Sequence, residues 1–103
     1  MTQQELPNGM TVHGLNRNET EYLYKEIFED EVYTPGDGFG FPERPVVFDV
    51  GANIGMFALF MAAKFPEARI FSFEPVPRTF DALQKNVGGV PNVSVFNMAL
   101  GDA

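Results

Sequence analysis

The stretch Pro45 to Gly55, PVVFDVGANIG, decides the fold of this chain of 103 residues. Its first half, Val46 to Val50, is a run of β-branched and aromatic residues with one acid, which is typical of a strand buried on both faces of a parallel sheet. Its second half contains two glycines. After Gly55, apolar residues recur at steps of three and four, which predicts a helix with one apolar side. The predicted order is therefore strand, glycine loop, helix.

The glycine loop is suited to hold a ligand against the main chain. Gly51 and Gly55 have no Cβ atom, so the backbone can adopt positive φ there. The helix that begins near Gly55 directs its unpaired N–H groups and positive dipole end toward the same space. Dinucleotide sites use this arrangement for a pyrophosphate, with the spacing G-x-G-x-x-G. Here the spacing is different and reads Asp49-x-Gly51-x-Asn53-x-Gly55. The carboxylate of Asp49, at the end of the strand, suits a cation or an ammonium group better than a phosphate.

A second acid follows a second predicted strand. The β run Ala68 to Phe73 ends at Glu74, and Pro75 comes next. Glu74 lies roughly 20 residues past the glycine loop, where an acid can accept hydrogen bonds from both hydroxyls of a ribose. The two acids therefore predict one ligand site at the strand ends.

The rest of the pattern predicts a parallel sheet with flanking helices. A helix follows Pro75 and Pro77, because proline is tolerated in a first helical turn. A third strand covers Asn92 to Asn97. Right-handed crossovers then give the spatial order 3-2-1. We therefore predict an α/β fold that forms part of a Rossmann-like three-layer sandwich, preceded by an N-terminal helix.

Residues 1–44 are predicted to form an N-terminal segment, separate from the domain at 45–103. The turn signal at Pro7 to Gly9 lies between two short extended pieces. A cap-like helix is expected over about 19–31, with Asn16 or Asn18 as its N-cap, and a Pro/Gly loop follows at Thr34 to Pro45. The only histidine, His13, lies in this segment and is expected at the surface.

The composition excludes several classes of protein. A net charge of -7 argues against nucleic-acid and anionic-membrane partners. The absence of cysteine excludes disulfides and thiolate metal sites, and we expect no metal. No run of about 18 apolar residues is present to span a bilayer, and no signal-like stretch begins at Met1. We therefore expect one small cytoplasmic domain.

Three motifs together resemble the FkbM family of S-adenosylmethionine-dependent O-methyltransferases. They are DVGANIG at 49–55, FSFEPVPRTFDALQKNV at 71–87 and NVSVFNMALGD at 92–102. The resemblance covers about Asn18 to Asp102 and implies the cofactor-binding half of a class I methyltransferase. It implies S-adenosylmethionine as the cofactor. It also implies a small-molecule acceptor, a hydroxyl on a secondary metabolite or a sugar.

The resemblance also assigns residues to the cofactor. They are Asp49, Gly51, Ala52, Asn53, Gly55, Glu74, Pro75, Asp102 and Tyr33. Glu74 would bind the ribose hydroxyls, and the glycine loop would hold the methionine end, with Asp49 acting through water or on the ammonium. Tyr33 would cover the cofactor together with the N-terminal helix. Asn97, Met98 and Asp102 all compete to approach the adenine, and the catalytic residues are not identified.

Three other interpretations stay open. The first is that Asp49 and Glu74 are strand-end acids satisfied by nearby N–H groups. The second is a nicotinamide-binding oxidoreductase, which would also use Glu74 on a ribose. It is disfavoured because Asp49 would face a pyrophosphate. The third is a noncatalytic module that keeps the fold without turnover.

The sequence ends at Ala103, where the second half of a class I methyltransferase would begin with a strand that pairs with the first one. We therefore expect a fragment that continues covalently in a longer protein or completes itself by association, because an open strand edge invites pairing. We expect the isolated chain to associate and to show no methyl transfer.

Overall fold

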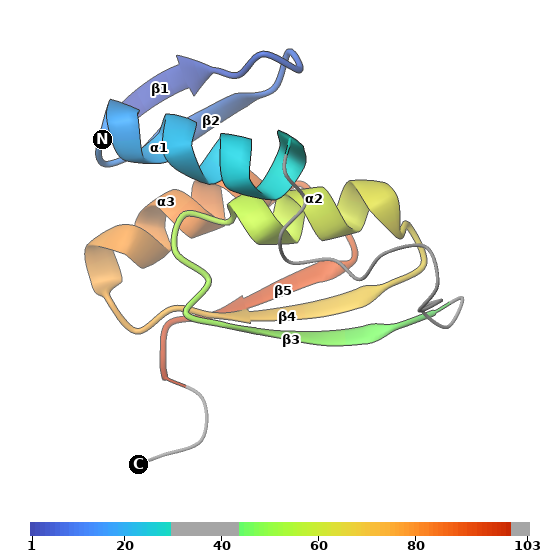
Figure 1. Ribbon diagram of the computed structural model, residues 1–103. Coiled ribbons are helices and arrows are strands. Elements are labelled where there is room, and N and C mark those ends of the chain that lie inside the picture. Colours follow the sequence, from blue (N-terminus) through green and yellow to red (C-terminus); the bar gives the residue numbers. More distant parts are fainter. Residues whose placement is uncertain (30–43, 100–103) are drawn as a thin grey trace.

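The computed structural model describes residues 1–29 and 44–99. Figure 1 shows a β-hairpin stacked on a layer of helices, with a parallel sheet below them. The elements, in chain order, are strands β1 (Thr2–Glu5) and β2 (Thr11–Gly14), helix α1 (Arg17–Tyr24), the π-helical turn η1 (Lys25–Glu29), strand β3 (Val46–Val50), helix α2 (Met56–Lys64), strand β4 (Arg69–Phe73), helix α3 (Pro77–Val87) and strand β5 (Val93–Phe96).

The parallel sheet confirms the predicted α/β, Rossmann-like fold. Its strand order is β3-β4-β5, which is the predicted order 3-2-1. Asp49 lies opposite Ser72, and Val50 lies opposite Phe73. The carboxyl ends of the strands therefore meet at one edge, where the glycine loop leaves β3 (Figure 1).

Both crossover helices, α2 and α3, lie on the same face of the sheet (Figure 1). Phe48 and Val50 on the opposite face are each 61% exposed. The prediction that this strand is buried on both faces is wrong for the described residues, because two successive right-handed crossovers place both helices on one side. The second helical layer of the expected sandwich is not among the residues that the structure describes.

The core lies between the helices and the inner face of the sheet. It is filled by fully buried apolar side chains from α2, α3 and β4, among them Met56, Met61, Leu83, Val87 and Ile70. Burial of each such side chain stabilises the fold by about 1.5–3 kcal/mol relative to its exposure. This packing holds the helices against the sheet and so fixes the positions of the strand ends.

The N-terminal segment packs against the same helical layer. The two predicted extended pieces flank a turn at Gly9, and they pair with each other as an antiparallel hairpin, which was not predicted. The N-cap is Asn16, whose Oδ1 accepts a hydrogen bond from the Glu19 N–H at 3.0 Å. The side chain of Phe28 packs edge-on against Phe60 of α2, which joins η1 to the core.

The helix begins at Arg17 and not near residue 19, because the cap is Asn16, and its last turn widens to a π-helix that ends at Glu29. The rest of the predicted helix, to residue 31, lies outside the described residues, as does most of the Pro/Gly loop. Among residues 1–29 and 44–99, no helix has the length and apolar character needed to cross a membrane.

Candidate functional site

A cavity of about 460 Å³ opens where β3 ends and α2 begins. Its floor comes from β3 and the glycine loop, and Leu23 and Ile27 reach it from α1 and η1. The structure brings four of the predicted cofactor residues to its wall: Asp49, Gly51, Ala52 and Asn53.

The two glycines of the loop have positive φ, as predicted, with +69° at Gly51 and +99° at Gly55. A Cβ atom at Gly51 would meet no atom within 4 Å, so the space beside its main chain is open. At Gly55 a Cβ atom would lie 2.9 Å from Leu83 Cδ1 and 3.1 Å from Val87 Cγ1. Gly51 therefore faces the cavity, while Gly55 allows α3 to pack closely against the loop.

Gly55 is also the N-cap of α2 and has no side chain to satisfy the first turn. Because the first N–H groups of a helix lack intrahelical acceptors, the positive end of α2 is directed at the loop. Gly55 does not line this cavity, and its contact with the cofactor stays a prediction.

Asn53 also has a positive φ, +58°, which was not predicted from the sequence. Its N–H donates a hydrogen bond to Oε1 of Glu74 at 2.7 Å. The next connection is between main chains, where the Ala52 N–H donates to the Phe73 carbonyl at 2.9 Å. These bonds fasten the glycine loop to the end of β4.

Glu74 is 6% exposed, and both of its carboxylate oxygens accept backbone hydrogen bonds. Besides the bond from Asn53, Oε2 accepts the N–H of Val76 at 3.1 Å. The interpretation of Glu74 as a strand-end acid satisfied by nearby N–H groups therefore describes its contacts in this structure. An ionised carboxylate has about four lone-pair positions, so two bonds leave capacity for further donors.

Glu74 lies at a second, smaller cavity of about 190 Å³. Leu23 and Asn53 line both cavities. The two acids therefore line neighbouring cavities at the carboxyl edge of the sheet, with Leu23 of α1 between them.

Asp49 is the next-to-last residue of β3, because the strand extends to Val50. Its side chain is 8% exposed, and the Ser72 hydroxyl donates a hydrogen bond to Oδ2 at 3.0 Å. Burial raises the pKa of Asp49, the Ser72 hydrogen bond opposes this, and the negative charge of Glu74 raises the pKa further. An acid in such surroundings is stabilised by a cationic ligand.

Ser72 was not among the predicted residues. The parallel register places Ser72 opposite Asp49, so the pairing of the two strands was the signal that could have identified it. Ser72 is fully buried and supports Asp49 from beneath the cavity.

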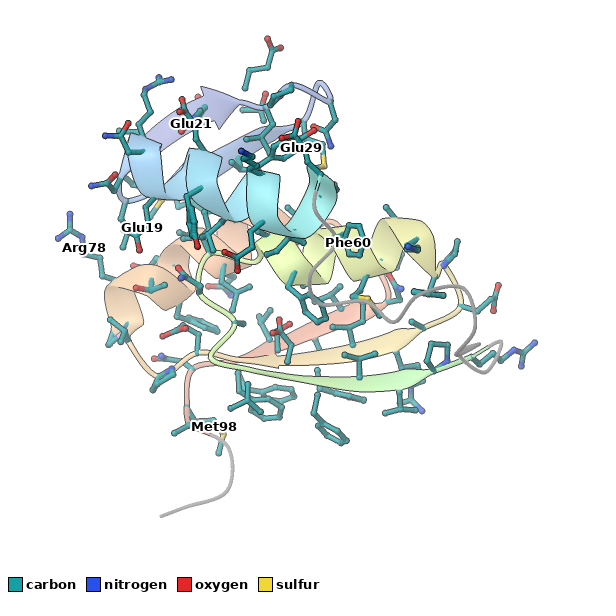
Figure 2. The ribbon with its side chains drawn as sticks, in the orientation of Figure 1. Glu19, Glu21, Glu29, Phe60, Arg78 and Met98 are labelled. Atoms are coloured by element: carbon teal, nitrogen blue, oxygen red, sulfur yellow. The ribbon has the colours of Figure 1, made fainter. Side chains whose placement is uncertain are left out.

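The other predicted residues lie at the end of β5 or outside the described chain. The Asn97 side chain donates to the carbonyls of Glu74 at 2.9 Å and Pro75 at 3.2 Å. Met98 is exposed on the side of the sheet away from the helices (Figure 2). Tyr33 and Asp102 lie outside the described residues.

His13 is half-buried, so the expected surface position holds only in part. Its ring Nε2 lies 3.2 Å from the Gln3 side-chain nitrogen.

Known methyltransferases resemble this chain in sequence. The 31-O-demethyl-FK506 methyltransferase FkbM of Streptomyces tacrolimicus is 49% identical over 83 residues, which are 79% of this chain and 31% of that enzyme. The sequence of this chain is that of the N-terminal region of an FkbM-like methyltransferase. The AMB antimetabolite synthetase AmbE of Pseudomonas aeruginosa is 51% identical over 100 residues, 96% of this chain and 5% of the synthetase. The FkbM-like chain thus spans less than a third of the length of either relative. No protein-family model matches it.

The fold also has a counterpart among solved structures. TYW2 of P. horikoshii in complex with MeSAdo has a TM-score of 0.60 with the FkbM-like chain, at 19% identity. The similarity covers 91% of this chain and 34% of TYW2. At this identity it shows the Rossmann-like fold alone.

Proposed function

We propose that the protein containing this chain transfers a methyl group from S-adenosylmethionine to a hydroxyl of a small molecule, such as a secondary metabolite or a sugar. This chain supplies the cofactor-binding half. The observation that carries the proposal is the cavity at the end of β3, where a buried acid, Asp49, lies beside the open main chain of Gly51. The curated relatives that are named methyltransferases support the reaction class.

The cavity of about 460 Å³ at the end of β3 suits the methionine end of the cofactor. Its volume lies in the range of about 300–1,000 Å³ that is usual for small-molecule sites. S-adenosylmethionine carries an ammonium group and a sulfonium, and Asp49 supplies the opposite charge. The positive φ of Gly51 and the space beside it let the main chain approach the ligand.

We place the ribose beside Glu74, on the lone pairs that its two backbone bonds leave free. Pro75 and the end of β5 then lie on the adenine side. Asn97 holds the chain at Glu74 and Pro75, and Met98 and Asp102 remain candidates for the adenine. Tyr33 belongs to the covering segment 1–44 in this proposal, and the domain proper is 45–103.

When bound, the cofactor supplies a methyl group that its sulfonium makes electrophilic. The residues of this chain hold the cofactor in a fixed orientation, which places the methyl group in line with an acceptor oxygen. Leu23 and Ile27 cover the cavity with apolar groups and exclude water from the sulfonium. We assign no catalytic residue within this chain.

The test is calorimetric titration of the complete gene product with S-adenosylmethionine and, separately, with NAD. We expect binding of S-adenosylmethionine and none of NAD. The opposite result would refute the proposal in favour of a nicotinamide enzyme. Binding without methyl transfer to any of a panel of hydroxylated metabolites and sugars would favour a noncatalytic module. A cytoplasmic location stays a prediction.

A further inference from the structure

Asn86, a half-buried residue of α3, joins three separate segments through one side chain. Its amide nitrogen Nδ2 donates to the carbonyl of Ile54 at 2.7 Å and to the carbonyl of His13 at 2.8 Å. Its Oδ1 accepts the His13 N–H at 2.6 Å. Both amide protons are therefore used, and strand β2, helix α3 and the glycine loop are connected at one point.

The segments that Asn86 joins also pack closely against one another at Gly14 and Gly55. A Cβ atom at Gly14 would collide with the Thr20 hydroxyl and would lie 3.7 Å from Ile54 Cδ1. A Cβ atom at Gly55 would lie 2.9 Å from Leu83 of α3. The hairpin and α3 therefore both pack against the loop at Ile54.

Ile54 stands between the two backbone positions that give the loop its shape. Asn53 has φ of +58° and Gly55 has φ of +99°. Left-handed backbone costs Asn53 more than it would cost a glycine, although asparagine tolerates it better than most residues, so bonds from outside the loop help to hold it. Glu74 fixes the N–H of Asn53, and Asn86 fixes the carbonyl of Ile54. The two side chains therefore hold the turn at two successive residues.

We propose that Asn86 is a positioning residue, which sets the loop for the cofactor without touching the cofactor; this rests on the proposed function. Asn86 lines neither of the two cavities that the loop borders. The hairpin thereby becomes part of the site's framework, because the two hydrogen bonds of Asn86 to His13 tie β2 to the loop. A change at Asn86 alters the affinity for S-adenosylmethionine through the backbone of Asn53 to Gly55.

The chain offers a matched control in Asn92. The Asn92 side chain donates to the carbonyl of Ala68 at 2.8 Å, at the opposite end of the sheet. Asn92→Ala therefore removes a similar side-chain bond to the backbone, away from the two cavities that the glycine loop borders. Asn86→Asp is a second variant with nearly the same shape. It keeps an acceptor for His13 N–H but places an oxygen against the carbonyls of His13 and Ile54.

The experiment measures the affinity of the complete gene product for S-adenosylmethionine by calorimetry, with the urea midpoint of each variant as the measure of stability. We expect Asn86→Ala and Asn86→Asp to weaken binding about tenfold and Asn92→Ala less than about twofold. Wild-type affinity in Asn86→Ala would overturn the proposal, as would an equal loss of affinity in Asn92→Ala.

Hydrogen exchange on the wild-type protein tests the same idea without a variant. If Asn86 ties the segments together, the amides of His13 and Asn53 open together and are similarly protected. Fast exchange at His13 beside a protected Asn53 would overturn the proposal, even if Asn86→Ala did not fold. Failure of the wild-type protein to bind S-adenosylmethionine would instead refute the proposed function, and the exchange result would still stand.

Discussion

The carboxyl ends of β3 and β4 each carry a buried acid, but the partners of the two acids differ. Glu74 accepts two backbone N–H groups, from Asn53 and Val76. Asp49 accepts the Ser72 hydroxyl, and burial raises its pKa. A carboxylate satisfied by N–H groups organises the backbone around it, whereas a buried carboxylate with one hydroxyl partner retains a demand for positive charge. The contacts of Glu74 fix the shape of the loop, and those of Asp49 support its proposed role as the group that attracts the cationic ligand.

The largest loss of affinity for S-adenosylmethionine is expected from a substitution of Glu74, at the end of β4. Glu74→Ala removes the acceptor for two N–H groups of the loop region together with the proposed ribose contact. Each hydrogen bond to a charged group contributes about 1.5–3 kcal/mol, so the affinity for S-adenosylmethionine should fall about a thousandfold. Calorimetry on the complete protein measures this.

The control for this variant is Glu67→Ala. Glu67 lies in an exposed ion pair with Arg44, 3.8 Å apart, and such pairs contribute little to stability. Its substitution should leave the affinity unchanged. If Glu74→Ala bound as tightly as the wild-type protein, Glu74 would contact neither the ribose nor a loop that matters for binding.

Gly51→Val tests the open side of the loop. A β-branched side chain there resists positive φ and fills the space that we assign to the cofactor, so the affinity should fall about a hundredfold. Gly9→Val is the matched control, because Gly9 has φ of +92° and equally open surroundings in the hairpin turn. Both variants should lose stability, but Gly9→Val should bind normally. Equal affinities in the two variants would mean that Gly51 does not border the ligand.

Asp49→Asn tests the charge at the β3 end, and we expect it to weaken binding about tenfold at neutral pH. The affinity of the wild-type protein should rise with pH as Asp49 loses its proton, because the ionised form attracts the cationic cofactor. Calorimetry at several pH values should show a smaller rise in the Asn variant. Identical pH profiles would exclude Asp49 as the group that binds the cation.

The same substitution has a defined effect on stability. The pKa of Asp49 is raised in the folded protein above its ordinary 3.8, so between these two values the folded state holds a proton that the unfolded state has lost. The free energy of unfolding therefore falls as pH rises through this window and changes no further above it. Urea unfolding should show this fall in the wild-type protein to be larger than in Asp49→Asn.

Much of this site follows from local sequence. The positive φ of Gly51 and Gly55 follows from their lack of a side chain and their place between a strand and a helix. The placement of Glu74 at the end of β4 follows from the length of one strand-helix-strand unit. These predictions needed only residues close together in the chain, and the structure agrees with them.

The features that no local sequence pattern predicts depend on contacts between distant segments. Asn86 lies 73 residues from His13, and no local pattern relates the two. The hydrogen bonds that Glu74 accepts from Asn53 and Val76 could not be predicted without the backbone path of the glycine loop. The exposure of Phe48 could not be foreseen either, because an apolar run shows what a strand can bury and not which helices cover it.

The smallest effect is expected at Ser72, which supports Asp49 without lining either cavity. Ser72→Ala removes the one hydrogen bond that opposes the effect of burial, so the pKa of Asp49 should rise further. NMR titration of the Asp49 carboxyl carbon measures this directly. A higher pKa leaves less of the ionised form, so the affinity should fall about threefold near that pKa and recover at higher pH. An affinity loss that persisted unchanged at high pH would mean that Ser72 shapes the cavity by packing and not through the charge of Asp49.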